Sequence, residues 1–407
     1  MFCLLKKDIS AILLAAMFCI LVIYIIIFPN ESFKAAHDGL LLWFNVVLPA
    51  LLPFFICVEI LIGLGIVRLL GSCFRSIMRP IFNIPGEGAF AFFMSIASGY
   101  PVGAKITASL FEGKACSRVE AQRMLSLCST SGPLFIIGAV ATGILSNPKL
   151  GILLAVSHYL SAISAGLLMR FWGGKKVKNK IAINVVSSHL PINPLKEMLE
   201  YRKKDGRPFG TLMGDAVKNG MNLIFTIGGF IILFSVITEV LKNAGILVLL
   251  SNCICTLLPF LKLNPQAVSS LFIGLLEVTN GIKECALVDM SLISKLMLIS
   301  FMIGFGGLSI NAQVLSVIAG AKLKFGIYTV MKLFQGVAAS IYTYFLFSIL
   351  GAKQVFNVFD SVNVRQYIRY LNTTFLDKIG DSTLNLSFVL VLMLLFALVK
   401  NKKRAKA

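Results

Sequence analysis

Charged residues are scarce in this sequence of 407 residues: only 14% are charged, whereas 57% are hydrophobic. Soluble globular domains have about 25% charged residues, so an ordinary soluble protein is excluded. The apolar residues gather in several runs of roughly 20 residues, the length that a helix needs to cross a bilayer. The composition therefore predicts an all-α integral membrane protein with several crossings.

Residues that hold metals or build catalytic centres are also few. The three histidines, His37, His158 and His189, are far apart along the chain, and the nine cysteines lie scattered, mostly within apolar segments. Neither set has the spacing of a metal site or of a disulfide framework. No nucleophile and base are placed together at one depth. The sequence thus predicts no enzyme activity, no metal and no other cofactor.

Acidic residues are outnumbered by basic ones, 18 to 38, which makes the formal net charge +20. A nucleic-acid partner would explain this charge, and so would the positive-inside rule for membrane proteins. With a cytosolic N-terminus and eight crossings, most basic residues fall on the cytosolic side, including clusters at 173–180, 201–207 and 400–407. The distribution favours membrane topology over nucleic acid and predicts that both the N and C termini are cytosolic.

The apolar runs predict eight crossings, at 9–28, 47–69, 120–145, 150–171, 218–241, 294–319, 325–350 and 383–399. The first run is too long for the apolar core of a signal peptide, about 7–15 residues, and is predicted to be an uncleaved anchor. Two runs are interrupted, by STSGPLF at 129–135 and by GFGGLSINAQ at 304–313. Glycine and proline break helices, and non-helical backbone at membrane depth must be satisfied by protein or a watery cavity. We therefore expect two broken transmembrane helices.

Two further segments, 87–112 and 266–290, are apolar but contain a polar turn near the middle. The turns are SGYPVGAK at 98–105 and TNGIKE at 279–284. About ten apolar residues precede each turn, and ten residues of helix reach only about 15 Å, half of a bilayer. Each segment is therefore predicted to be a re-entrant hairpin that enters the membrane, turns at mid-depth and leaves on the same side.

The two halves of the chain resemble each other. Residues 69–85 align with 249–265 at an offset near 180, and the hairpin turns and helix breaks follow at similar offsets. Three crossings separate equivalent points, so the repeats are expected to be inverted in the membrane. The predicted parts are an anchor (1–35), repeat 1 (36–171), a basic cytosolic linker (172–210), repeat 2 (211–350), and an external loop with a last helix and basic tail (351–407).

Broken helices and hairpins in inverted repeats are typical of secondary transporters, which hold substrate near the midplane. Helix starts at the tips and breaks expose N–H groups that attract anions. Lys105 and Lys283 follow the paired hairpin glycines, and a buried ammonium usually faces a cavity or a partner. In the alternative interpretation neither lysine contacts substrate. Lys105 then snorkels toward the cytosol, and Lys283 pairs with Glu277 or Glu284. The candidate substrate-binding residues are Ser98, Gly99, Tyr100, Pro101, Gly103, Lys105, Ser129, Thr130, Ser131, Gly132, Glu277, Thr279, Asn280, Gly281, Lys283, Gly306, Gly307, Ser309, Asn311 and Gln313.

Four motifs at these positions, SGYPVGAK, SGPLFIIGAV, LLEVTNGIK and GFGGLSINAQVLSV, resemble the YlbJ/SpoVV sporulation integral membrane proteins in order and spacing. That family is part of the gate-domain group, which is related to concentrative nucleoside transporters, and the resemblance covers about residues 1–350. It implies transport of dipicolinate, a small aromatic dicarboxylate, from the mother cell across the outer forespore membrane by alternating access. It also places substrate at both hairpin tips and both helix breaks.

Several alternatives remain open at this point. The chain could instead carry nucleosides, nucleobases or other small anions, or it could bind a ligand without transporting it, as a sensing membrane partner. Related nucleoside carriers couple to sodium or protons and form trimers, which implies a homo-oligomer by analogy. The sequence itself fixes neither the coupling ion nor the direction of transport.

Overall fold

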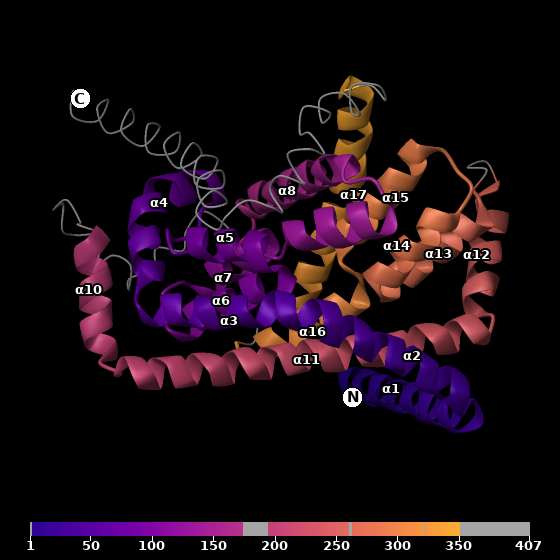
Figure 1. Cartoon of the computed structure of the whole chain (residues 1–407), viewed down its shortest axis with the longest axis horizontal. Helices are drawn as coiled ribbons and strands as arrows, with labels where there is room; N and C mark the ends of the chain where they lie inside the picture. Colours follow the sequence, from indigo (N-terminus) through magenta and orange to yellow (C-terminus); the bar gives the residue numbers. More distant parts are fainter. Residues whose placement is uncertain (1, 174–193, 260–262, 322, 351–407) are drawn as a thin grey trace, which may run out of the picture. The chain divides into compact units, whose positions relative to one another are not determined.

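A computed structural model describes residues 2–173, 194–259, 263–321 and 323–350, and the regular structure in these ranges is all helical (Figure 1). The chain divides into two units, Met1–Leu346 and Phe347–Ala407, and the description below concerns the first. The predicted external loop, the crossing at 383–399 and the basic tail lie outside the described residues, as does most of the basic linker.

The first half begins with helices that precede the hairpin. Its elements are α1 (Phe2–Ile27), α2 (Pro29–Leu42), the π-helix η1 (Trp43–Val47), α3 (Leu48–Gly63), α4 (Ile66–Phe82), α5 (Gly88–Ser98), α6 (Tyr100–Glu112), α7 (Arg118–Leu127), the π-helix η2 (Leu134–Ile144) and α8 (Lys149–Met169).

The second half follows α10 (Pro194–Asp205). Its elements are α11 (Phe209–Asn243), α12 (Ile246–Leu257), α13 (Pro265–Leu276), α14 (Val278–Leu287), α15 (Leu292–Phe305), α16 (Gly307–Ile318) and α17 (Phe325–Leu350). From α3 in the first half and α11 in the second, both halves show the same order: two successive helices, a helical hairpin, an interrupted helix and a long helix.

The helices are long and apolar enough for a membrane protein, which confirms the predicted class. Four described stretches could each span a bilayer, namely Lys149–Met169, Phe209–Asn243, Leu292–Ile318 and Phe325–Ile349. Two bent pairs, Ala15–Ile27 with Pro29–Asn45 and Leu51–Gly63 with Ile66–Phe82, raise the number to six if each is one span. The count of eight crossings, the inversion of the repeats and the side on which each terminus lies stay predictions.

The predicted crossing at 47–69 is shorter than expected, because the chain turns at Gly65. Gly65 has φ +84°, a left-handed conformation that favours glycine, and α3 and α4 meet at an angle of 78°. Gly245, 180 positions later, has φ +70° and begins α12 in the same way. The sequence correspondence between the halves is thus matched by a turn of the same backbone conformation.

Glycines let the helices of each hairpin approach their neighbours closely. A Cβ on Gly103 of α6 would lie 1.8 Å from the carbonyl oxygen of Cys128 and 2.6 Å from the Cβ of Ser95 in α5. A Cβ on Gly281 of α14 would lie 2.1 Å from the Cα of Gly274 in α13. Backbone therefore packs on backbone in both hairpins, and no side chain larger than hydrogen fits at these positions.

Both predicted helix breaks are present in the structure. Residues 128–132 are non-helical between α7 and η2, and the helix before them begins with a capping box formed by Ser117 and Glu120. In the second half, Gly306 separates α15 from α16 with φ +84°, and Gly307 follows with φ +71°. Each break brings polar backbone into the interior, where a cavity or side chains must satisfy it.

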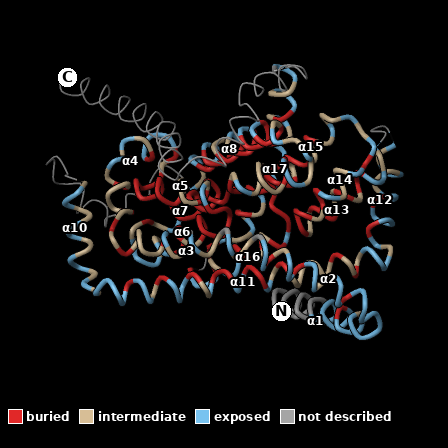
Figure 2. The backbone as a smooth tube through the Cα atoms, viewed as in Figure 1, coloured by how far each residue is buried: buried red, intermediate tan, exposed pale blue. Residues whose placement is uncertain are grey.

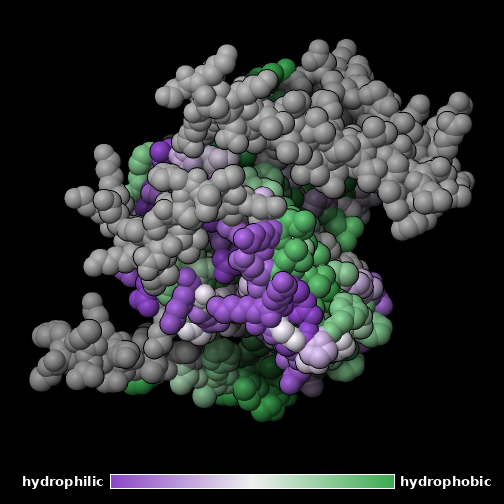
Figure 3. All heavy atoms as spheres, turned by 90° about the vertical axis from the view of Figure 1, so that its left-hand side faces the viewer, coloured by the Kyte–Doolittle hydropathy of each residue, from purple (hydrophilic) through white to green (hydrophobic). Residues whose placement is uncertain are grey.

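Burial is highest where the hairpins and interrupted helices pack together (Figure 2). The long helix α11 runs alongside α2, α3 and α16, and much of its outer side is exposed (Figures 1 and 2). Hydrophilic side chains gather on the face shown in Figure 3, the end of the molecule that carries α10. α10 has no buried residue, and its last turn contains Arg202, Lys203 and Lys204.

Candidate functional site

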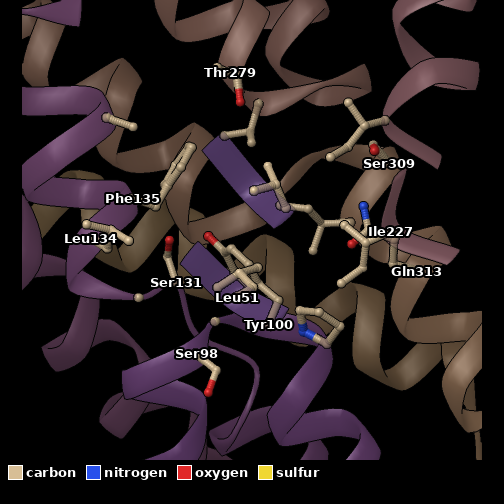
Figure 4. A pocket seen from close by; sticks show the side chains of 18 of the residues that line it. Leu51, Ser98, Tyr100, Ser131, Leu134, Phe135, Ile227, Thr279, Ser309 and Gln313 are labelled. Atoms are coloured by element: carbon tan, nitrogen blue, oxygen red, sulfur yellow. The ribbon is translucent and has the colours of Figure 1, made fainter. Parts of the chain in front are cut away.

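The tips of the two hairpins and the two helix breaks surround one cavity of about 350 Å³. Figure 4 shows Tyr100 and Ser131, from the first half, facing Thr279 and Ser309, from the second. Both halves of the chain therefore contribute polar groups to a single chamber. The cavity volume falls within the range of roughly 300–1,000 Å³ that is usual for sites of small molecules.

Half of the predicted substrate-binding residues line this cavity. They come from all four predicted elements and are Ser98, Gly99, Tyr100, Pro101, Ser131, Gly132, Glu277, Thr279, Ser309 and Gln313. The other predicted residues do not line it and are Gly103, Lys105, Ser129, Thr130, Asn280, Gly281, Lys283, Gly306, Gly307 and Asn311.

Apolar side chains form another side of the cavity. Leu42, Val47 and Leu51 come from the helices that precede the first hairpin, and Ile227 and Ile231 come from α11. A ligand in the cavity would thus meet polar groups from the tips and breaks and apolar groups from these helices. The arrangement suits a small molecule with a flat apolar body and polar substituents.

Several helices begin at or near the cavity. Gly99, Pro133 and Gly306 are the N-cap residues of α6, η2 and α16, and none of these three starts has a side-chain cap. α14 differs, because the carboxylate of Glu277 accepts hydrogen bonds from two backbone N–H groups of its first turn, at 2.7 and 3.1 Å. The partial positive charge of a helix start attracts anions, so the three uncapped starts favour a negatively charged ligand.

Lys105 does not point into the cavity, in contrast to the expectation of a lysine clamp. Its Nζ donates to Oε1 of Glu59 in α3, and Oε2 of Glu59 accepts from Nδ2 of Asn219 at 3.2 Å. The sequence showed no carboxylate near the first hairpin tip, because this partner is 46 positions away along the chain. The charge of Lys105 is thus balanced by an ion pair between the hairpin and a neighbouring long helix.

Lys283 also lies away from the cavity and is exposed. Glu284, one of the two carboxylates proposed as its partner, pairs instead with Lys242 of α11 at 2.8 Å. Glu277, the other, is held by backbone N–H groups at the start of α14. The argument that two unmatched lysines require an anion therefore does not hold for this arrangement.

The remaining predicted residues shape the cavity without lining it. Ser129 Oγ lies 2.9 Å from Oη of Tyr328, and Thr130 Oγ1 lies 3.0 Å from Oγ of Ser95. Asn311 is buried and neither atom of its amide has a hydrogen-bond partner within the described part of the chain. Backbone packing or backbone conformation accounts for the glycines at 103, 281, 306 and 307. Asn280 donates its backbone N–H to Glu277.

Two buried residues beside the cavity were missed by sequence reasoning, His158 of α8 and Lys332 of α17. Nε2 of His158 accepts a hydrogen bond from the backbone N–H of Ser131 at 2.8 Å. Nζ of Lys332 donates to the carbonyl oxygen of Ser129 at 2.9 Å. A lysine in the middle of the apolar run 325–350 was the available signal, since ionisable residues at membrane depth are usually functional.

The described residues contain no group of three or more His, Cys, Asp or Glu side chains that could hold a metal ion. What the site offers is hydrogen bonding, helix-start electrostatics and an apolar wall. These groups can bind and orient a small molecule.

Two comparisons with known proteins found a match. Residues 44–145, which include the first hairpin and the first helix break, match the Gate family, described as nucleoside recognition. The chain is 40% identical over 340 residues to the sporulation integral membrane protein YlbJ of Bacillus subtilis (strain 168), covering 84% of this chain and 83% of that protein. No solved structure matches the chain. The resemblance predicted from the four motifs is confirmed, and the chain belongs to the YlbJ family of sporulation integral membrane proteins.

Proposed function

We propose that this protein is a secondary transporter that carries dipicolinate across the outer forespore membrane from the mother cell, by alternating access. The observation that carries the proposal is the single cavity built from both hairpin tips and both helix breaks. Interrupted helices around a central cavity are how secondary transporters hold a small substrate in the membrane.

The chemistry of the cavity supports a small aromatic anion as the substrate. Dipicolinate is a flat pyridine ring with two carboxylates on its edge. The ring would lie against the apolar side formed by residues such as Leu51 and Ile227, and the carboxylates would face the polar side, where Gly99 marks the uncapped start of α6. The choice of dipicolinate and of the outer forespore membrane is part of the proposal and is motivated by the membership in the sporulation family.

A nucleoside or nucleobase is the second candidate substrate, and the Gate match over residues 44–145 favours it. The cavity also holds Glu277 and Gln313, whose side chains can accept hydrogen bonds from ribose hydroxyls or base edges. The two candidates differ in charge, so competition between them separates the two functions.

Uptake of labelled dipicolinate into vesicles that contain the purified protein tests the proposal. We expect saturable uptake that excess unlabelled dipicolinate removes and excess uridine does not, because the uncapped helix starts favour an anion. Lys283→Met is the control variant, and it should take up dipicolinate like the wild type because Lys283 lies outside the cavity. Saturable uptake of uridine without uptake of dipicolinate would establish the second candidate. Binding of dipicolinate without uptake would contradict transport.

A further inference from the structure

The most deeply buried cation in the described part of the chain is Lys332, whose exposed fraction is 0%. It lies on α17 and contacts the first helix break, but it does not line the cavity. Its Nζ donates to the carbonyl oxygen of Ser129 at 2.9 Å and to Oε1 of Gln335 at 2.7 Å. The same nitrogen lies 4.8 Å from the centre of the Tyr100 ring.

All three of these contacts suit a charged ammonium group. The two oxygens accept hydrogen bonds, and the face of an aromatic ring attracts a cation. The Ser129 carbonyl also follows the C-terminal end of α7, where the helix dipole favours positive charge. Within the described residues, the hydrogen-bond and ion-pair partners of Nζ include no carboxylate. Its charge is therefore stabilised locally but not cancelled.

Tyr100 separates this charge from the cavity. Its ring lines the cavity, and its hydroxyl donates to the carbonyl oxygen of Ile303, which fixes the ring in place. Lys332 thus sits one aromatic ring away from the space that a ligand would occupy. The surroundings are buried protein, where a charge acts over a longer distance than it does in water.

Among the described residues that line the cavity, only Glu277 has a charged side chain. Two backbone N–H groups hold that carboxylate at the start of α14. Without a nearby positive charge, a dicarboxylate in the cavity would meet a like charge and no opposite one. A protonated Lys332, in contact with the Tyr100 ring, would supply that positive charge.

We propose that Lys332 is the specificity-determining residue that makes this cavity select anions, acting through space across the Tyr100 ring rather than by direct contact. The proposal rests on the proposed function, because it assigns the charge preference of the same cavity. It also replaces the role that the sequence had suggested for Lys105 and Lys283 with a residue on a different helix.

The test compares dipicolinate with pyridine-2,6-dicarboxamide, a neutral molecule of nearly the same shape. The affinity of each compound for the purified full-length protein is measured by titration, with the ratio of the two as the readout. Lys332→Met keeps the length of the side chain and removes its charge. Gln335→Glu keeps the acceptor for Nζ and adds a carboxylate beside it, so it cancels the charge without removing the lysine. Lys332→Arg keeps the charge and is the matched control.

We expect the wild type to prefer dipicolinate, and we expect Lys332→Met and Gln335→Glu each to lose roughly tenfold or more of that preference. Affinity for the diamide should stay nearly unchanged in both variants, whereas a merely structural role would weaken both compounds together. Lys332→Arg should keep most of the preference. If Lys332→Met does not fold, Gln335→Glu decides the matter alone.

An unchanged ratio in Gln335→Glu, or an equal loss for both compounds, would overturn the role of Lys332. If the wild type bound the diamide or uridine but not dipicolinate, the proposed function itself would fail, and this inference would fail with it. The two failures are distinguishable because the first concerns the variants and the second the wild type.

Discussion

Replacing Gly103 with valine should leave little or no folded protein. A Cβ at this position would lie 1.8 Å from the carbonyl oxygen of Cys128 and 2.6 Å from the Cβ of Ser95, and valine adds two further methyl groups. Overpacking by single methylenes already costs about 1–3 kcal/mol, and here the obstacle is backbone that belongs to the first helix break. We expect a loss of at least about 3 kcal/mol of stability, measured as the yield and thermal unfolding of the detergent-purified protein.

Gly229→Val is the matched control for this prediction. Gly229 lies on α11, is exposed, and has open space around the position that a Cβ would take. The same substitution there should change stability by less than about 1 kcal/mol, and helix propensity favours valine over glycine. Equal yields and equal unfolding temperatures for the two variants would show that α6 does not pack on the break as described.

Replacing Ser309 with tryptophan should abolish binding and uptake of dipicolinate while the protein still folds. Ser309 lies in the first turn of α16 and its side chain faces the cavity (Figure 4). An indole ring at this position would occupy much of the cavity of about 350 Å³. We expect a loss of at least roughly a hundredfold in affinity, because the aromatic ring of the ligand and the indole need the same space.

Ser316→Trp on the same helix separates this effect from general damage. Ser316 is exposed and does not line the cavity, so its variant should bind and transport dipicolinate like the wild type. Thermal unfolding of both variants checks that each is folded. Normal uptake by a folded Ser309→Trp variant would place the binding site elsewhere.

Three of the four interruptions lie within the stretches predicted for them, because local sequence determines them. The fourth prediction was wrong in position: TNGIKE at 279–284 lies within α14, and the second hairpin turns at Glu277, whose carboxylate caps that helix. Gly99 has φ +95° and Gly306 has φ +84°, conformations that other residues rarely adopt, so a glycine within an apolar run marks the interruption directly. The all-helical membrane class follows from composition in the same direct way. The family was recognised because its motifs are these same turns and breaks.

Side-chain partners could not be predicted, because they come from distant parts of the chain. Lys105 looked unpaired in its own segment, yet Glu59 lies beside it in the fold. Lys332 looked like one residue of a long crossing, yet it meets Ser129, 203 positions earlier. Hydrophobic periodicity shows which helix face is buried, but not which polar groups of two buried faces will meet.

The crossing predicted at 47–69 shows a different limit of sequence reasoning. Its hydropathy is continuous across Gly65, so a window average cannot show that the chain turns there. The left-handed conformation of that glycine and the amphipathic pattern of α4 end the crossing early. The useful signal is the pattern of hydrophobic residues. A uniformly apolar run that becomes amphipathic after a glycine indicates that the crossing has ended and that an amphipathic helix has begun.

Calorimetric titration of the purified wild-type protein with dipicolinate tests the central claim most directly. The claim is that both hairpin tips and both helix breaks form one chamber for a small aromatic dianion. We predict saturable binding of one dipicolinate per chain, unaffected by excess uridine. Absence of binding at any concentration, or displacement of dipicolinate by an equal concentration of uridine, would contradict it.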